Sequence, residues 1–388
     1  MPLINELLDR GERDEARAQA EKTVAQKPTD GEALSALARL ALEAGEVEVA
    51  QRHLARVLPR ERELYEVKLC EAMVLQLSGR PDAARLAFAE LTAQHPRRPE
   101  GFFSLGLSLL EKEDGKGAEK ALATAVQLQP KHFLYRYRHA EALAQVGRMA
   151  EAAEALIKCI EWKPDFVPGY LAFARLLEGT GQPDRAFEIL EAGLASMPTE
   201  RRLMAELTRL KLGTGEVDAA YAQAEKAEGG ALGLAEELMR GNAHNAALAI
   251  CEELDKRGKG SAKVTLLKGV AHEGAGRTDE ALAAYATAMK QDPSDWSAAN
   301  NRGLLLLETA GDDAAKLAEA KLNLDEAVSR ARGKVPDPLL NLALWYGRQE
   351  QWAEGIATAQ QVASHPNAGA LKSQAEKMVT SMQAAQKA

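Results

Sequence analysis

The stretch GRMAEAAEALIKCIEWKPD, residues 147–165, contains the signals that decide the fold of this chain. Gly147 opens it, Ala152 lies within an apolar, Ala-rich run, and Pro164 ends it. This order is typical of a turn, a closely packed helix and a stop. Because the same signals recur every 34 residues, the sequence predicts a linear array of helical hairpins, not a domain built around one centre.

Three residue types keep the 34-residue spacing. We expect alanine where two antiparallel helices approach closely near their turn, since a larger side chain would push them apart. Glycine is expected in the turn because it adopts positive φ at little cost. The periodic positions are Ala16, Ala50, Ala84, Ala118, Ala152, Ala186 and Ala220; Gly11, Gly45, Gly79, Gly147, Gly181 and Gly215, with Glu113 in the one remaining turn; and Pro96, Pro130, Pro164 and Pro198.

The spacing changes after Ala220, which predicts where the array is irregular. The next alanine taken as equivalent is Ala246, 26 residues later, and Ala281 follows after 35. This predicts a hairpin with a clipped first helix around residues 231–257. The next step, to Ala320, is 39 residues and predicts a longer helix or loop.

These breaks predict four segments of the chain. Residues 1–228 form an N-terminal array of about seven regular repeats whose first helix covers residues 1–10. Residues 229–261 form an irregular, Gly-rich repeat or hinge. Residues 262–368 form a C-terminal array of about three repeats, one with an insertion, and residues 369–388 a polar-faced capping helix.

Composition limits the function classes. The chain has 49 Lys and Arg against 57 Asp and Glu, a net charge of -8, which disfavours binding to a phosphate backbone. Three separated cysteines without a CxxC pair are typical of a reducing compartment. The N-terminus lacks a secretory signal pattern, and no run approaches the roughly 18 apolar residues of a membrane helix. We therefore expect a cytoplasmic protein that binds no nucleic acid and does not insert into a membrane.

Signatures of catalysis and of cofactor binding are missing. The sequence has no GxxxxGK[ST], HExxH or GxSxG motif and no GxGxxG motif after a strand. His132 and His139 are near each other but have no neighbouring cysteine, so ordinary packing or surface roles are favoured over a metal site. Cys70, on a predicted first helix, is the thiol that we expect to face a groove. We predict no catalytic residue, cofactor or metal.

Residues 262–293 resemble the tetratricopeptide repeat most closely. They contain Gly269 in the first helix, Gly276 at the turn, then Ala281, Tyr285 and Pro293. The resemblance implies an all-α, right-handed superhelical solenoid of about eleven antiparallel helical hairpins with a C-terminal capping helix. It also implies that the first helices line a concave groove in which peptides or partner helices bind.

The groove residues that the resemblance implies lie on the inner faces of first helices. An apolar anchor is expected near Phe103 and Leu107, and asparagine amides are expected to bind a ligand backbone. The alternative for the aromatic and aliphatic residues is packing between neighbouring first helices, and for the asparagines it is hydrogen bonding within or at the ends of helices. The predicted partner-binding residues are Leu69, Met73, Phe103, Leu107, Tyr137, Arg138, Glu141, Arg175, Arg209, Asn300, Asn301 and Asn341.

Three function classes follow from these observations. The favoured one is a non-catalytic scaffold or adaptor of a bacterial-type cytoplasmic assembly that holds one or more protein partners in its groove. The second is a regulatory or targeting subunit of an enzyme, although no globular non-repeat segment is visible. The third is RNA binding by helical repeats, whose basic charge and recurring polar residue pair are missing. A homo-oligomer stays open, through an edge repeat or through Trp345, Tyr346 and Trp352.

Overall fold

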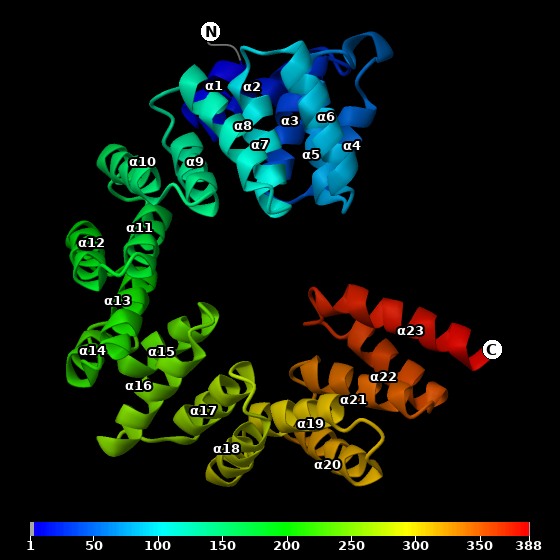
Figure 1. Ribbon diagram of the computed structural model, residues 1–388. Helices are drawn as coiled ribbons and strands as arrows, with labels where there is room; N and C mark the ends of the chain where they lie inside the picture. Colours follow the sequence, from blue (N-terminus) through cyan, green and yellow to red (C-terminus); the bar gives the residue numbers. More distant parts are fainter. Residues whose placement is uncertain (1–3, 388) are drawn as a thin grey trace. The chain divides into compact units, whose positions relative to one another are not determined.

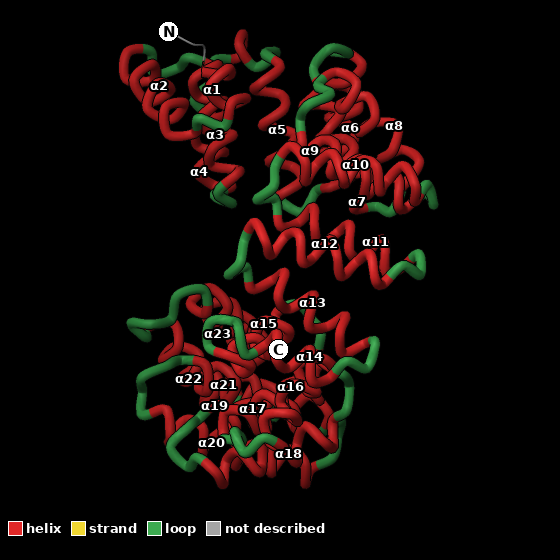
Figure 2. The backbone as a smooth tube through the Cα atoms, turned by 90° about the vertical axis from the view of Figure 1, so that its left-hand side faces the viewer, coloured by secondary structure: helices red, strands yellow, loops and turns green. Residues whose placement is uncertain are grey.

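The computed structural model describes residues 4–387. Within that range the secondary structure consists of 23 α-helices and one short 3₁₀ helix, without a strand (Figures 1 and 2). The predicted all-α fold class is therefore confirmed. The helix predicted over residues 1–10 begins at Ile4, and residues 1–3 lie outside the described residues.

In chain order the described helices form eleven hairpins, followed by one further helix. The first helices are α1 (Ile4–Arg10), α3 (Gly31–Glu43), α5 (Tyr65–Leu77), α7 (Pro99–Glu111), α9 (Phe133–Gln145), α11 (Val167–Gly179), α13 (Arg201–Gly213), α15 (Gly230–Arg240), α17 (Ala262–Gly274), α19 (Ser297–Thr309) and α21 (Asp337–Arg348). The second helices are α2 (Arg13–Gln26), α4 (Val47–Ala55), α6 (Pro81–Gln94), α8 (Gly115–Leu128), α10 (Met149–Trp162), α12 (Pro183–Ser196), α14 (Val217–Ala224), α16 (His244–Lys256), α18 (Thr278–Gln291), α20 (Ala314–Ala331) and α22 (Trp352–Ser364). The 3₁₀ helix η1 (Pro59–Glu61) precedes α5, and α23 (Leu371–Lys387) follows α22.

The contacts between helices divide the chain into two compact units, Met1–Ile189 and Leu190–Ala388. The division falls within α12, whereas the Gly-rich stretch 229–261 lies inside the second unit. The hinge predicted for that stretch stays a prediction. In both units, second helices such as α8 and α18 pack against the first helix of their own hairpin and against the first helix of the next one.

The periodic alanines are the tightest contacts of the array. All seven, from Ala16 to Ala220, are 0% exposed. The six periodic turn glycines have φ between 73° and 83°, and Glu113 adopts φ 60° in the turn that lacks glycine. Each of these alanines follows a turn of left-handed backbone and enters the second helix where the two helices are closest, as the sequence predicted.

The first break in the period lies one residue from its predicted place. Ala247 is 0% exposed and Ala246 8%, and the turn residue Asn242, with φ 57°, lies 27 residues after Gly215. The equivalent alanine is therefore Ala247, and the assignment of Ala246 is wrong.

The shortening also falls on a different helix. The second helix α14 has 8 residues where α10 has 14, while the first helix α15 has 11. The prediction of a clipped first helix is thus only partly right. Gly229 at φ 79° and Gly230 at φ 64° let the chain turn directly from the end of α14 into α15.

The second break is a longer helix, as one of the two predicted forms. Helix α20 has 18 residues, and Asp313 caps its N-terminus by accepting hydrogen bonds from the backbone N–H groups of Ala315 and Lys316. Ala320, the buried alanine of this helix, lies six residues after its start, whereas Ala281 lies three residues after the start of α18. The insertion therefore adds about one turn before the packed alanine.

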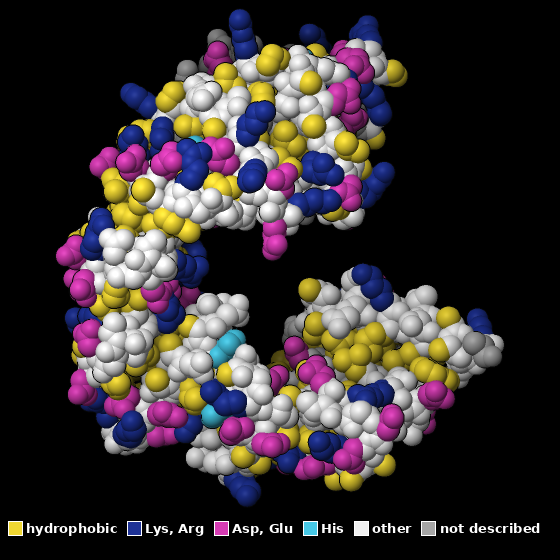
Figure 3. Space-filling view, viewed as in Figure 1, with side chains coloured by type: hydrophobic (Ala, Val, Ile, Leu, Met, Phe, Trp, Pro, Cys, Tyr) yellow, Lys and Arg dark blue, Asp and Glu magenta, His cyan; other side chains and the backbone are white. Residues whose placement is uncertain are grey.

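The surface carries both signs of charge. Lys and Arg are interspersed with Asp and Glu over the visible face of each unit (Figure 3). Among the helices of the described residues, none combines the length and the apolar composition that crossing a bilayer requires.

Enlarging a periodic alanine should destabilise the first unit. We expect Ala152→Leu to lower the free energy of unfolding by about 1–3 kcal/mol, because the added methyl groups would overpack a contact with no free surface. Ala150→Leu, at an exposed position of the same helix, is the matched control. Urea unfolding followed by circular dichroism measures both, and equal effects of the two changes would contradict the packing role.

The C-terminal helix is predicted to act as a cap. Ala375 of α23 packs with Leu340 and Val362 in a buried cluster, and Met382 lies against Gly355. We expect removal of residues 369–388 to expose this cluster and cause aggregation without unfolding the first six hairpins, because coupling in such arrays is between neighbours. Light scattering and thermal melting test this, and a truncated chain that stays soluble and melts like the full chain would show that α23 is no cap.

Candidate functional site: a hollow between first helices

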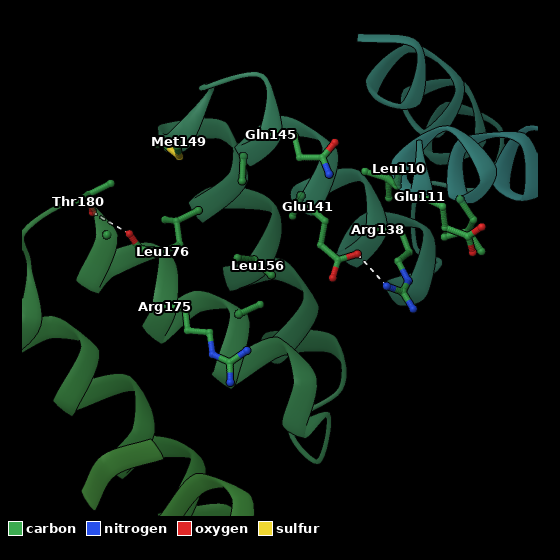
Figure 4. Close-up of a pocket in the computed structure, with 15 residues that line it drawn as sticks. Leu110, Glu111, Arg138, Glu141, Gln145, Met149, Leu156, Arg175, Leu176 and Thr180 are labelled. Carbon is green, nitrogen blue, oxygen red and sulfur yellow. Dashed lines mark hydrogen bonds and ion pairs between the residues drawn. The ribbon is translucent and has the colours of Figure 1, made fainter. Parts of the chain in front are cut away.

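The first unit contains a hollow of about 810 Å³ between the first helices of three successive hairpins, α7, α9 and α11 (Figure 4). Part of its wall comes from the second helix α10. The lining residues are Leu107, Leu110 and Glu111 of α7; Arg138, Ala140, Glu141, Ala144 and Gln145 of α9; Met149 and Leu156 of α10; Ala172, Arg175, Leu176 and Gly179 of α11; and Thr180, which follows α11.

Small residues on the facing helices leave this space open. At the 34-residue step that begins with Leu42 and passes Leu110, hairpin five has Ala144. At the step that passes Glu111 and Gln145, hairpin six has Gly179. Helix α10 packs against both α9 and α11, so the two first helices are joined through it around the hollow. The volume is in the range of pockets that hold small molecules or several side chains of a peptide.

The floor of the hollow is apolar and its rim is charged. Met149 is 40% exposed although it is a large apolar residue, which marks surface that a ligand could cover. On the rim, Arg138 Nη1 donates to Glu141 Oε2 at 2.9 Å, and Arg175 extends from α11 on the same open side (Figure 4). A ligand that binds here would therefore bury apolar side chains beside groups of both charges.

Tyr137 connects this rim to the packing between hairpins. Burial, together with its hydrogen bond to the Glu141 carboxylate, raises the pKa of Tyr137 to about 12. The Arg138 guanidinium carbon lies 5.3 Å from the centre of the Tyr137 ring, and the ring meets Phe166 edge-on with centroids 5.1 Å apart. Arg138 and Glu141 are thus held in place before any ligand arrives.

The structure brings together four of the predicted groove residues, Leu107, Arg138, Glu141 and Arg175, around the hollow. Phe103 does not line it, because its ring packs against Tyr135 with centroids 4.7 Å apart. This is the alternative role considered from the sequence, and Tyr137 also packs in this way. A binding role for Phe103 or Tyr137 stays a prediction.

The other predicted groove residues lie elsewhere. In hairpin three, Leu69 is 5% exposed in the core with Tyr65 and Phe88, and Met73 packs against the same cluster. In the second unit, Arg209 pairs with Glu206 at 3.1 Å. Their binding roles remain predictions that the hollow does not use.

The three predicted asparagines bond to one another. Asn341 Nδ2 donates to Asn300 Oδ1 at 2.9 Å, and Asn300 Nδ2 donates to Asn301 Oδ1 at 3.3 Å. Asn300 is 6% exposed. Their amide groups are therefore already used between α19 and α21.

The expectation that Cys70 faces a groove is wrong. The side chain is 2% exposed, and its Sγ lies 3.4 Å from the Ser35 carbonyl oxygen, to which it donates. Burial raises the pKa of the Cys70 thiol to about 12. The reason is that α5 packs directly against α3, so this face of α5 is covered.

The histidines considered for a metal site have other partners. His132 accepts a hydrogen bond from the Tyr135 backbone N–H at the start of α9, and His139 lies 3.5 Å from Glu119. Within the part of the chain that the structure describes, no three His, Cys, Asp or Glu side chains are placed to hold a metal ion.

Sequence reasoning missed the half of the hollow contributed by α10 and by small residues. Met149 and Leu156 lie on a second helix, which was not expected to reach the groove. The detectable signal was the replacement of large residues by Ala144 and Gly179 at neighbouring periodic positions.

An all-α array of stacked hairpins with an open face between first helices defines a helical-repeat protein of the solenoid class. Models of one family, the tetratricopeptide repeat, match residues 7–68, 71–119, 103–158 and 266–322, together more than half of the chain. The chain belongs to the tetratricopeptide-repeat family.

Individual relatives match more distantly. The protein STIP1 homolog of Dictyostelium discoideum is 31% identical over 134 residues, which are 34% of this chain. The matching part spans only 24% of that relative's length. Among solved structures, MamA is 22% identical and covers 42% of this chain and 95% of its own, with a TM-score of 0.37. A tetratricopeptide repeat protein from Parabacteroides merdae is 14% identical and covers 79% and 99%, with a TM-score of 0.44.

The burial of the thiols predicts slow chemical modification. Cys70, Cys159 and Cys251 are at most 2% exposed, and burial raises the pKa of each to about 12. Because the thiolate is the reactive form, we expect almost no reaction with Ellman's reagent at pH 8 in the native chain and three equivalents in denaturant. Rapid release of one equivalent from the native chain would contradict the burial of that thiol.

Proposed function

We propose that this chain is a non-catalytic scaffold whose first unit binds an apolar segment of a partner protein in the hollow between α7, α9 and α11. The observation that carries the proposal is the hollow itself, with its apolar floor and its ordered charged rim. Proteins of the tetratricopeptide-repeat family are generally protein-interaction modules, which supports a protein ligand.

The residues proposed to act are divided by role. Leu107 and Met149 contribute apolar surface that a ligand side chain covers. Arg138 and Glu141, paired with each other, and Arg175 orient polar groups of the ligand along the rim. Since the rim carries both charges, the ligand is expected to be an apolar segment with polar flanks of mixed charge.

The wider role is the assembly of a cytoplasmic complex by holding one or more such partners. Three widely separated cysteines, all unpaired, support a reducing compartment. The acidic net charge of -8 supports protein partners over nucleic acid.

Peptide binding provides the test. A phage-displayed library of 20-residue peptides is selected on the full chain, and the strongest peptide is synthesised and titrated by fluorescence anisotropy. We expect Leu107→Glu to weaken its binding at least thirtyfold, because replacing an interface anchor costs about 2 kcal/mol or more and the new carboxylate is poorly solvated in the hollow.

The matched control is Leu86→Glu, a change of the same kind at a residue that is 65% exposed on α6 and outside the hollow. It should leave the affinity unchanged. Circular dichroism shows whether each variant melts like the parent chain. Equal affinities of the two variants, both folded, would place peptide binding outside the hollow and overturn the proposal.

A further inference from the structure

Helix α21 has three polar side chains on one stripe, and each donates a hydrogen bond to the preceding hairpin, α19–α20. Asn341, Trp345 and Arg348 are spaced by four and three residues, so they share a face of the helix. Trp345 Nε1 donates to the Leu317 carbonyl oxygen at 2.8 Å. The Arg348 guanidinium donates to the carbonyl oxygens of Gly311, at 2.6 Å, and of Leu307.

The third bond of the stripe continues into a chain of side-chain bonds. Asn341 donates to Asn300, which donates to Asn301. The Asn301 side chain is hydrogen-bonded to the Tyr285 hydroxyl oxygen, and that hydroxyl donates to the Glu273 carboxylate. Each group is a donor to the next, and a carboxylate, the strongest acceptor, ends the chain.

These residues come from three consecutive hairpins. Glu273 lies on α17, Tyr285 on α18, Asn300 and Asn301 on α19, and Asn341 on α21. Tyr285 is 0% exposed, and its ring lies under Gly269, where an added Cβ would come within 2.5 Å. The chain therefore runs through the interior of the stack and links first helices that are 34 and 40 residues apart.

The position of this network coincides with the second break in the period. Asn301 and Asn341 each lie two residues before the small residue that packs against a second helix, Gly303 or Ala343. They are 40 residues apart because α20 is longer than the other second helices. At the buried position of Tyr285 most other hairpins have an apolar residue, such as Leu122 in α8 or Leu156 in α10. Polar bonding thus replaces regular packing where regular spacing is lost.

We propose that the seven residues Glu273, Tyr285, Asn300, Asn301, Asn341, Trp345 and Arg348 form a latch that joins hairpins nine to eleven, α17–α22, into one cooperative unit. The latch holds α21 on α19–α20 and assigns the three asparagine amides to joining helices instead of gripping a ligand. It is independent of the hollow in the first unit. Elsewhere in the array, neighbouring hairpins are expected to open separately.

Hydrogen exchange of the full chain, read by mass spectrometry, tests the latch. In the parent chain, amides of α17–α22 should exchange with one shared opening rate. In Asn341→Leu we expect the amides of α21 and α22 to exchange roughly tenfold faster while those of α17 and α18 keep the parent rate, because a buried hydrogen bond between the two parts is lost. Asn245→Leu, at an exposed asparagine of α16, is the control and should change neither.

A double-mutant cycle removes the ambiguity between a latch and simple damage. Asn300→Leu and Asn341→Leu each leave a polar group without its partner, whereas the double variant removes both. The latch predicts that the double variant is faster than the parent by clearly less than the product of the two single effects. Fully multiplicative effects, or equal acceleration across α17–α22 in Asn341→Leu, would overturn the proposal.

Discussion

The close approach of two antiparallel helices at one small residue is the constraint on which the rest of the structure depends. A fully buried alanine in each regular second helix sets the distance between the helices of a hairpin. The stacking of one hairpin on the next repeats this contact, and the apolar stripe of each helix is covered only by its neighbours. The left-handed turn and the terminal proline keep the helix lengths uniform, so that the small residue meets its contact in every repeat.

The same constraint explains why the array can hold an open site. The packing of second helices maintains the stack, which leaves the first helices free to be close in one place and apart in another. Where α5 lies against α3, residues such as Cys70 and Leu69 are covered. Around α9 and α11, Ala144 and Gly179 leave the hollow instead. Function can therefore be placed on first helices without loss of the contacts that keep the chain folded.

This arrangement also decides how much could be predicted from the sequence. Ala, Gly and Pro report short-range geometry, so the period, the number of hairpins and the longer α20 could be predicted. Ala246 and Ala247 are adjacent alanines, and periodicity alone could not separate them; the turn residue Asn242 does so in the structure. The exposure of Cys70 or Leu107 depends on the separation of neighbouring first helices, which no single repeat specifies. Phe103 and Asn300 illustrate the same limit, because their partners, Tyr135 and Asn341, lie in other hairpins.

The short helix α14 has a consequence for how the chain carries force. In a linear array, tension applied to the two ends passes through every hairpin in series, so each one bears the same load. Helix α14 has 8 residues, and Gly229 and Gly230 follow it at positive φ. It therefore offers less buried surface per unit of chain than the 14-residue second helices to resist that load. The mechanical strength of the whole chain is set by this one hairpin, however well the others are packed.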